Sequence, residues 1–68
     1  MCGIIGINSN KSVSATIINS LKKLEYRGYD SAGIATLSNG LINEIKSEGR
    51  VENLEKNSLV QNMQGTIG

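Results

Sequence analysis

Ala32-Gly-Ile-Ala-Thr-Leu-Ser-Asn-Gly-Leu-Ile-Asn-Glu-Ile-Lys46 carries the clearest local structural signal in the chain. An apolar run over residues 32–37 ends at Ser38-Asn39-Gly40, and a loosely alternating run follows over residues 41–46. Asn-Gly between two strand-like runs is the strongest short-range signal for a hairpin, because both turn positions need positive φ. The segment therefore predicts a β-hairpin.

Upstream of the hairpin, apolar residues recur at helical spacing. Over residues 12–25 they fall on one face, at Val13, Ile17, Ile18, Leu21 and Leu24. This period predicts a helix. Ser12 or Asn10 is expected to be its N-cap. Lys22 and Lys23 lie near its C-terminal end, where positive charge suits the helix dipole.

The two ends of the chain have strand-like patterns. Residues 2–7 are a short apolar run that ends in turn formers, which predicts a buried strand. Residues 66–68 look like the start of another strand. A chain end that carries chemistry needs such anchoring, since unanchored termini fray.

A weaker helix is predicted after the hairpin. Residues 48–50 turn the chain, and Val51, Leu54 and Leu59 then indicate a second helical face, which polar residues on both sides of Leu59 weaken. The order is strand, helix, hairpin, helix, start of strand. This order is typical of an α+β fold and shows no internal domain boundary.

Composition excludes several classes of protein. The 68 residues include one Cys and no His, Phe or Trp. They provide neither an internal disulfide nor a Cys/His zinc cluster, and no cofactor motif is present. Chains this short bury only about 60% of their unfolded surface. Aliphatic packing or further protein must therefore supply the stability, which suggests a truncated domain.

The charge pattern argues against two kinds of partner. A net charge of +1, without basic–aromatic interleaving, gives no reason to expect nucleic acid or a membrane surface. No apolar run approaches the roughly 18 residues needed to span a bilayer. With no secretory pattern and an unpaired thiol, the expected location is the cytoplasm.

Cys2 is the candidate nucleophile. Removal of Met1 would give Cys2 a free α-amino group beside its own thiol. An α-amine titrates near pH ~8, so it can accept a proton at neutral pH, and a terminal amine is one way to activate a side-chain nucleophile. Gly3 leaves room for a substrate. The alternative is that Cys2 is a small buried hydrophobic residue, as free cysteines usually are.

Two motifs together resemble the class II glutamine amidotransferases, which are N-terminal-nucleophile hydrolases. One is the opening Met1-Cys2-Gly3-Ile4-Ile5-Gly6, and the other is Leu24-Glu25-Tyr26-Arg27-Gly28-Tyr29-Asp30-Ser31-Ala32-Gly33. The string that begins at Tyr26 is similar to the sugar-phosphate aminotransferases of this class, which make glucosamine 6-phosphate from fructose 6-phosphate and glutamine. The resemblance runs along essentially the whole chain, and its diagnostic residues lie in 1–7 and 24–33.

The resemblance implies a fold and an architecture. The expected fold is a four-layered αββα sandwich, of which residues 1–68 form the N-terminal part of the glutaminase domain. The rest of that domain and the sugar-isomerase domains would be absent. The full-length parent would be a homo-oligomer that uses neither a metal nor a cofactor.

The resemblance also implies a mechanism. The Cys2 thiolate would attack the side-chain carboxamide of glutamine, ammonia would leave, and water would hydrolyse the γ-glutamyl thioester. In the family, ammonia then passes to the isomerase domain, and residues absent here supply the oxyanion hole and most of the glutamine site. Because losing one oxyanion donor lowers the rate about 100- to 1000-fold, the 68 residues alone are expected to be inactive.

Four further residues are expected to support the site. By resemblance, Gly3 and Arg27 bind substrate or hold the N-terminal residue, Arg27 through its fork of donors. Alternatively, Arg27 pairs with Asp30 or caps the preceding helix. Gly28 allows the loop conformation. Asp30 is expected to hold the loop through bonds to the backbone, with general-base chemistry as the alternative.

Two other interpretations stay open. The chain is also similar to other class II amidotransferases, such as amidophosphoribosyltransferase, which shares an N-terminal Cys-Gly-Ile and an Arg-Gly-x-Asp loop. It is alternatively a truncated, non-catalytic interface module, in which Met1 is retained and Cys2 only packs.

Overall fold

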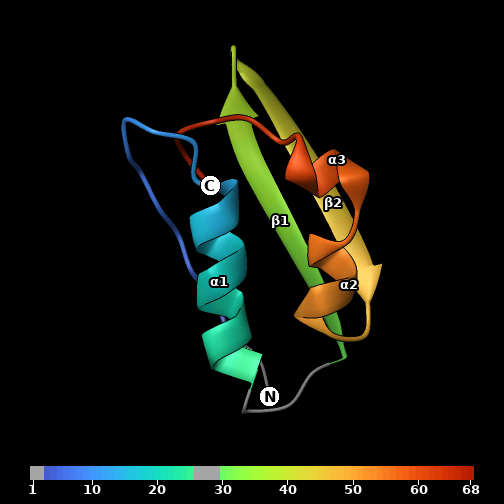
Figure 1. Ribbon diagram of the computed structural model, residues 1–68. Coiled ribbons are helices and arrows are strands. Elements are labelled where there is room, and N and C mark those ends of the chain that lie inside the picture. Colours follow the sequence, from blue (N-terminus) through green and yellow to red (C-terminus); the bar gives the residue numbers. More distant parts are fainter. Residues whose placement is uncertain (1–2, 26–29) are drawn as a thin grey trace.

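A β-hairpin is the centre of the structure, a computed structural model that describes residues 3–25 and 30–68 (Figure 1). β1 (Ser31–Ser38) and β2 (Leu41–Glu48) pair antiparallel, with Ile34 opposite Ile45. The φ angles of Asn39 and Gly40 are 53° and 76°, and both turn residues therefore have the left-handed conformation that this tight turn requires. The predicted hairpin is confirmed, and both strands extend beyond the predicted bounds.

The predicted long helix is confirmed as α1 (Ser14–Leu24), with Lys22 and Lys23 in its last turn. Its N-cap was predicted wrongly. Val13 occupies the cap position, and no side chain there accepts a hydrogen bond. The Val13 N–H donates instead to the Gly65 carbonyl oxygen at 3.1 Å. Val13 is only 1% exposed, so burial of this apolar residue sets where the helix begins.

The predicted second helix is two short helices, α2 (Val51–Glu55) and α3 (Ser58–Gln61). Asn57 separates them, because its side-chain oxygen accepts a hydrogen bond from the Leu59 N–H at 2.9 Å and caps α3. Leu59 was expected on the buried face but is 68% exposed, and Val60 is buried in its place. The interruption at Asn57 moves the apolar face by one residue.

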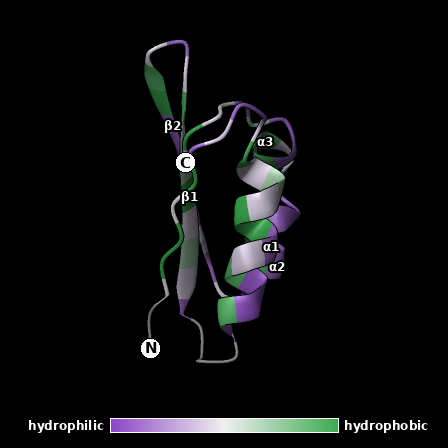
Figure 2. Ribbon diagram, turned by 90° about the vertical axis from the view of Figure 1, so that its left-hand side faces the viewer, coloured by the Kyte–Doolittle hydropathy of each residue, from purple (hydrophilic) through white to green (hydrophobic). Residues whose placement is uncertain are grey.

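The three helices lie on one side of the sheet (Figure 2). The core lies between the helices and the inward face of the hairpin. It contains one polar side chain from β1, Thr36, whose hydroxyl donates to the Gln64 carbonyl oxygen at 2.7 Å. The remaining core residues are aliphatic or Met: Val13, Ile17, Ile18, Ile34, Val51, Leu54, Val60 and Met63. The described residues thus form a two-layered α+β arrangement, as the α+β class predicts.

Residues 66–68 extend the sheet. Ile67 bridges Leu37 of β1 on one side and Asn8 on the other, both antiparallel. The Leu37 N–H donates to the Ile67 carbonyl oxygen at 2.9 Å, and the Ser9 N–H donates to the Thr66 carbonyl oxygen at 2.8 Å. The predicted start of a strand is confirmed, and it lies between the N-terminal segment and β1.

The predicted N-terminal strand is wrong over residues 3–7, which are not assigned as a strand. Ile4 is 94% exposed rather than buried, although Ile5 and Ile7 pack against the core. Pairing begins only at Ile7, which exchanges two backbone hydrogen bonds with Gly68, of 2.7 and 2.9 Å. Among the described residues, 3–6 have no strand beside them, and a strand depends on its neighbours for stability.

Candidate functional site

The residues predicted to form a site are described only in part. Cys2, Arg27 and Gly28 lie outside the described residues. Gly3 and Asp30 are described, and both are exposed. The described part of the candidate site therefore consists of the chain that follows Cys2 and the residues on either side of 26–29.

Gly3 lies directly against the C-terminal end of α1. A Cβ atom added at Gly3 would be 2.9 Å from Leu24 Cδ1 and 3.1 Å from Leu24 Cβ. A side chain at this position would force the Leu24 side chain to shift, so glycine allows the close contact. The sequence suggested that Gly3 leaves room for a substrate, and in the structure Gly3 lies against the helix.

Both flanks of the loop over residues 26–29 are bound to the same turn before α2. On the N-terminal flank, the Glu25 carboxylate accepts a hydrogen bond from the Val51 N–H at 2.7 Å. On the C-terminal flank, the Asp30 carbonyl oxygen accepts one from the Gly49 N–H at 2.8 Å. Residues 49–51 therefore bind both Glu25 and Asp30, the described residues on either side of 26–29.

Glu25 is a site residue that sequence reasoning missed. Its carboxylate satisfies a free N–H at the start of α2, where negative charge is also favoured by the helix dipole. The two residues are 26 positions apart, so no local sequence signal connects them. Asp30 was predicted to hold the segment before it through its side chain, and the contact observed here, with the Gly49 N–H, is made by its backbone carbonyl instead.

A small cavity lies beside Gly3. It has a volume of about 110 Å³ and opens between the N-terminal segment and β1, under α1. Its lining is almost entirely aliphatic or glycine: Gly3, Ile4, Ile5, Ile17, Leu21, Gly33, Ile34, Ala35 and Gly68. No charged side chain contributes to it, so the cavity suits packing of a chain segment rather than acid–base chemistry.

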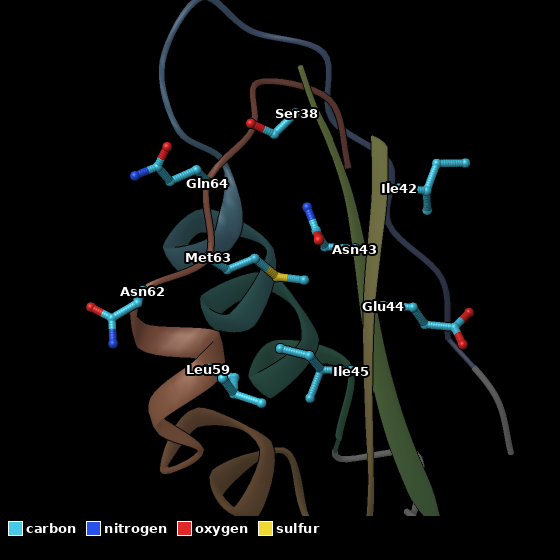
Figure 3. Close-up of a pocket in the computed structure, with 9 residues that line it drawn as sticks. All are labelled: Ser38, Ile42, Asn43, Glu44, Ile45, Leu59, Asn62, Met63 and Gln64. Atoms are coloured by element: carbon cyan, nitrogen blue, oxygen red, sulfur yellow. The ribbon is translucent and has the colours of Figure 1, made fainter. Parts of the chain in front are cut away.

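A larger hollow of about 550 Å³ lies between β2 and the segment after α3 (Figure 3). Asn43, Ile45 and Met63 point toward it, whereas Ile42 and Glu44 point to the other side of β2. The Asn62 side chain is already engaged, because its amide donates to the Ser58 carbonyl oxygen at 2.9 Å. The hollow brings no nucleophile and base together and lies away from Gly3.

Several charged side chains of the described region form ion pairs at the surface. Lys22 of α1 contacts Glu55 of α2 at 2.6 Å, and Lys56 contacts Glu52 at 2.8 Å. The hydrogen bond and the charge of Lys56 lower the pKa of Glu52, and the same contact raises the pKa of Lys56. Within residues 3–25 and 30–68, no cluster of metal-ligating side chains is present.

Comparison with known proteins gives matches along the whole chain. It is 53% identical over all 68 residues to a protein of Brucella abortus, 48% identical to one of Rhizobium meliloti, and 47% identical to one of Bartonella henselae. The chain spans 11% of the length of each of these relatives. No family model matches it.

By their names, these relatives are aminotransferases that act with glutamine and a sugar phosphate. Each is named glutamine–fructose-6-phosphate aminotransferase (isomerizing). The chain is a homologue of one segment of the glutamine–fructose-6-phosphate aminotransferases. The resemblance predicted from residues 1–7 and 24–33 is therefore confirmed. In the described part of the chain, no helix is long and apolar enough to cross a bilayer.

Proposed function

We propose that this chain provides the nucleophile of a glutaminase site, with Cys2 attacking the carboxamide of glutamine to release ammonia. The ammonia would serve the conversion of fructose 6-phosphate to glucosamine 6-phosphate. The observation that carries this proposal is the identity of 47–53% over the whole chain to enzymes whose name includes both substrates. The same names disfavour amidophosphoribosyltransferase as the related enzyme.

The chemistry assigned to Cys2 requires Met1 to be removed. The free α-amine then accepts the thiol proton, and the thiolate forms a bond to the carboxamide carbon of glutamine. The resulting oxyanion collapses, the C–N bond breaks, and ammonia leaves with the proton that the amine held. Water then adds to the thioester, the C–S bond breaks, glutamate is released and the free thiol of Cys2 is regenerated.

The structure supports the proposal through the way in which the neighbours of Cys2 are held. Ile7 exchanges two hydrogen bonds with Gly68, and Gly3 is pressed against Leu24. A nucleophile on a chain end needs this kind of anchoring, because its position decides whether it reaches the substrate. Arg27, in a loop whose two flanks are both bound to the turn over 49–51, is proposed to help hold the N-terminal residue.

The proposed fold of the complete site is the αββα sandwich of the N-terminal-nucleophile hydrolases. The exposed side of the sheet is compatible with a second sheet layer. Its apolar residues include Leu37 and Ile42, which are opposite each other on β1 and β2 and are 39% and 76% exposed. The 68 residues alone are expected to release no measurable glutamate from glutamine.

The reactivity of Cys2 tests the proposed role of its amine. Two chains, one starting at Met1 and one at Cys2, are made by chemical synthesis and treated with iodoacetamide at neutral pH. The chain that starts at Cys2 is expected to react about threefold to tenfold faster, because a neighbouring ammonium group favours the thiolate. Intact-mass measurement follows the reaction, with Cys2→Ala as the unlabelled control.

Equal alkylation rates for the two chains would contradict the proposed pairing of thiol and amine. Retention of Met1 in the protein isolated from cells would favour the non-catalytic interface module instead, since a retained Met1 removes the free amine from Cys2.

A further inference from the structure

The two-residue turn between β1 and β2 presents a carboxamide next to an unoccupied backbone nitrogen. Asn39 and Gly40 have φ angles of 53° and 76°, and both residues are exposed. Of the residues that the structure describes, none is hydrogen-bonded to the Asn39 carboxamide or to the Gly40 N–H. A Cβ placed on Gly40 would have nothing within 4 Å apart from its chain neighbours. The attacking nitrogen is therefore unobstructed.

The other asparagines of the chain are in different situations. None of them precedes a glycine. Several also use their side chains in hydrogen bonds. The Asn57 side-chain oxygen accepts from the Leu59 N–H at 2.9 Å, and the side-chain amides of Asn53 and Asn62 donate to backbone carbonyl oxygens at 3.3 and 2.9 Å. Asn39 thus combines a free carboxamide with a following glycine.

We propose that Asn39 is a site of spontaneous covalent modification, at which the chain deamidates through a cyclic imide with Gly40. The Gly40 nitrogen loses its proton to a base and forms a bond to Asn39 Cγ. The Cγ–Nδ2 bond then breaks, and the leaving amide takes up a proton and departs as ammonia. The step is favoured because the reacting groups are already joined in one short segment, and glycine has no Cβ to shield the nitrogen.

Water opens the imide ring, and no further reactant is needed. Attack of water at the Asn39 Cγ gives aspartate with an unchanged backbone. Attack at the main-chain carbonyl carbon gives isoaspartate, in which the backbone passes through Cβ and Cγ and is one atom longer. Either product adds one negative charge, which takes the formal net charge from +1 to zero.

The additional backbone atom of isoaspartate lies where the register of the hairpin is set. Ser38 and Leu41 pair across the turn, and Ile34 is opposite Ile45 farther along the strands. Because turn length fixes the register of a hairpin, a longer turn disturbs these pairs. Isoaspartate at position 39 is therefore expected to destabilise the sheet. Aspartate tolerates the left-handed region as asparagine does, and is expected to change the sheet little.

Incubation of the 68-residue chain at mildly alkaline pH tests the proposal. Intact-mass measurement detects the replacement of NH2 by OH, and peptide mapping locates the changed residue. Asn39 is expected to convert first, at a rate that rises with hydroxide concentration because the attacking nitrogen must lose its proton. Gly40→Ala should slow the conversion by at least about tenfold, the effect of about 1.4 kcal/mol in activation free energy.

A second asparagine placed before glycine separates the effect of the fold from that of the sequence. Ser20→Gly creates this pair at Asn19, which is exposed like Asn39 but lies inside α1. Ring closure needs rotation of the backbone, and a helix must first open locally to allow it. In the native chain Asn19 of this variant should convert at least about tenfold more slowly than Asn39, whereas in concentrated urea the two rates should be similar.

Equal rates at Asn19 and Asn39 of this variant without urea would overturn the proposal. It would also be overturned if another asparagine of the original chain converts before Asn39, or if Asn39 converts only in urea. The measurement does not involve Cys2, so this proposal and the proposed glutaminase function can fail separately.

Discussion

Two glycines on facing segments show how single residues determine this fold. A Cβ atom at Gly68 would lie 2.6 Å from Ile17 Cδ1 and 3.0 Å from the Ala35 carbonyl oxygen. At Gly6, the nearest neighbour of a Cβ would be the Gly68 carbonyl oxygen, at 3.8 Å. Both residues appear as glycine in the sequence, and only their surroundings show that one of them is required for packing.

Gly68→Ala and Gly6→Ala are therefore expected to differ in stability. Gly68→Ala forces a side chain against backbone and against α1, and should lower the free energy of unfolding by about 1–3 kcal/mol. Gly6→Ala should change it by less than about 0.5 kcal/mol. Urea unfolding followed by circular dichroism measures both. Equal effects of the two substitutions would show that residues 66–68 are not packed under α1.

At the scale of secondary-structure elements, local signals predicted most of what is observed. The Asn-Gly pair predicted the hairpin, and the apolar period predicted α1, because turn conformation and helical burial are both properties of short segments. The N-cap of α1 and the break at Asn57 were not predicted. The N-cap of α1 depends on a distant contact, the bond from Val13 to Gly65. The break at Asn57 comes from a local one, in which the Asn57 side chain accepts from the Leu59 N–H and starts a new helix.

The turn of the hairpin can be tested by Gly40→Ala. Gly40 has a φ of 76° and nothing within 4 Å of an added Cβ, so the substitution changes backbone conformation without any clash. Because the left-handed region costs a non-glycine residue about 1–2 kcal/mol, the free energy of unfolding should fall by about that amount. A thermal unfolding midpoint equal to that of the unchanged chain would contradict the assigned turn.

The contact between Glu52 and Lys56 makes α2 sensitive to pH. Lys56 lowers the pKa of Glu52 below its ordinary value of 4.5, so the stabilising contribution is present above pH 4.5 and is lost as the pH falls through the lower, folded-state pKa. On the alkaline side, the contribution of Lys56 is complete below its ordinary pKa of 10.5 and is lost as the pH rises through its raised pKa.

Unfolding in urea at neutral and acidic pH tests this dependence. Glu52→Gln should reduce the difference in stability between the two pH values, whereas Glu48→Gln, which lies outside this ion pair, should leave it unchanged. The effect is expected to be small, since exposed pairs contribute little and are screened by salt. If Glu52→Gln leaves the pH dependence as it was, the pairing does not persist in solution.

At the scale of the whole molecule, the α+β class was predicted and the arrangement of the strands was not. The sequence placed strands at both chain ends but could not show that residues 66–68 lie between the N-terminal segment and β1, because pairing over such a separation has no local signal. For the candidate site, Cys2, Gly3 and Arg27 were predicted from their motifs and stay predictions. The contact of Glu25 with Val51 was not predicted, because it depends on the tertiary structure.

Cys2 is proposed to be the nucleophile of a glutaminase site. A chimera tests this proposal, in which this chain replaces the matching segment of the Brucella abortus relative, with which it shares 53% identity. The chimera is predicted to release glutamate from glutamine, and Cys2→Ala in the chimera should lower that rate by at least about a thousandfold. A folded chimera without glutaminase activity, or one in which Cys2→Ala leaves the activity intact, would contradict the account.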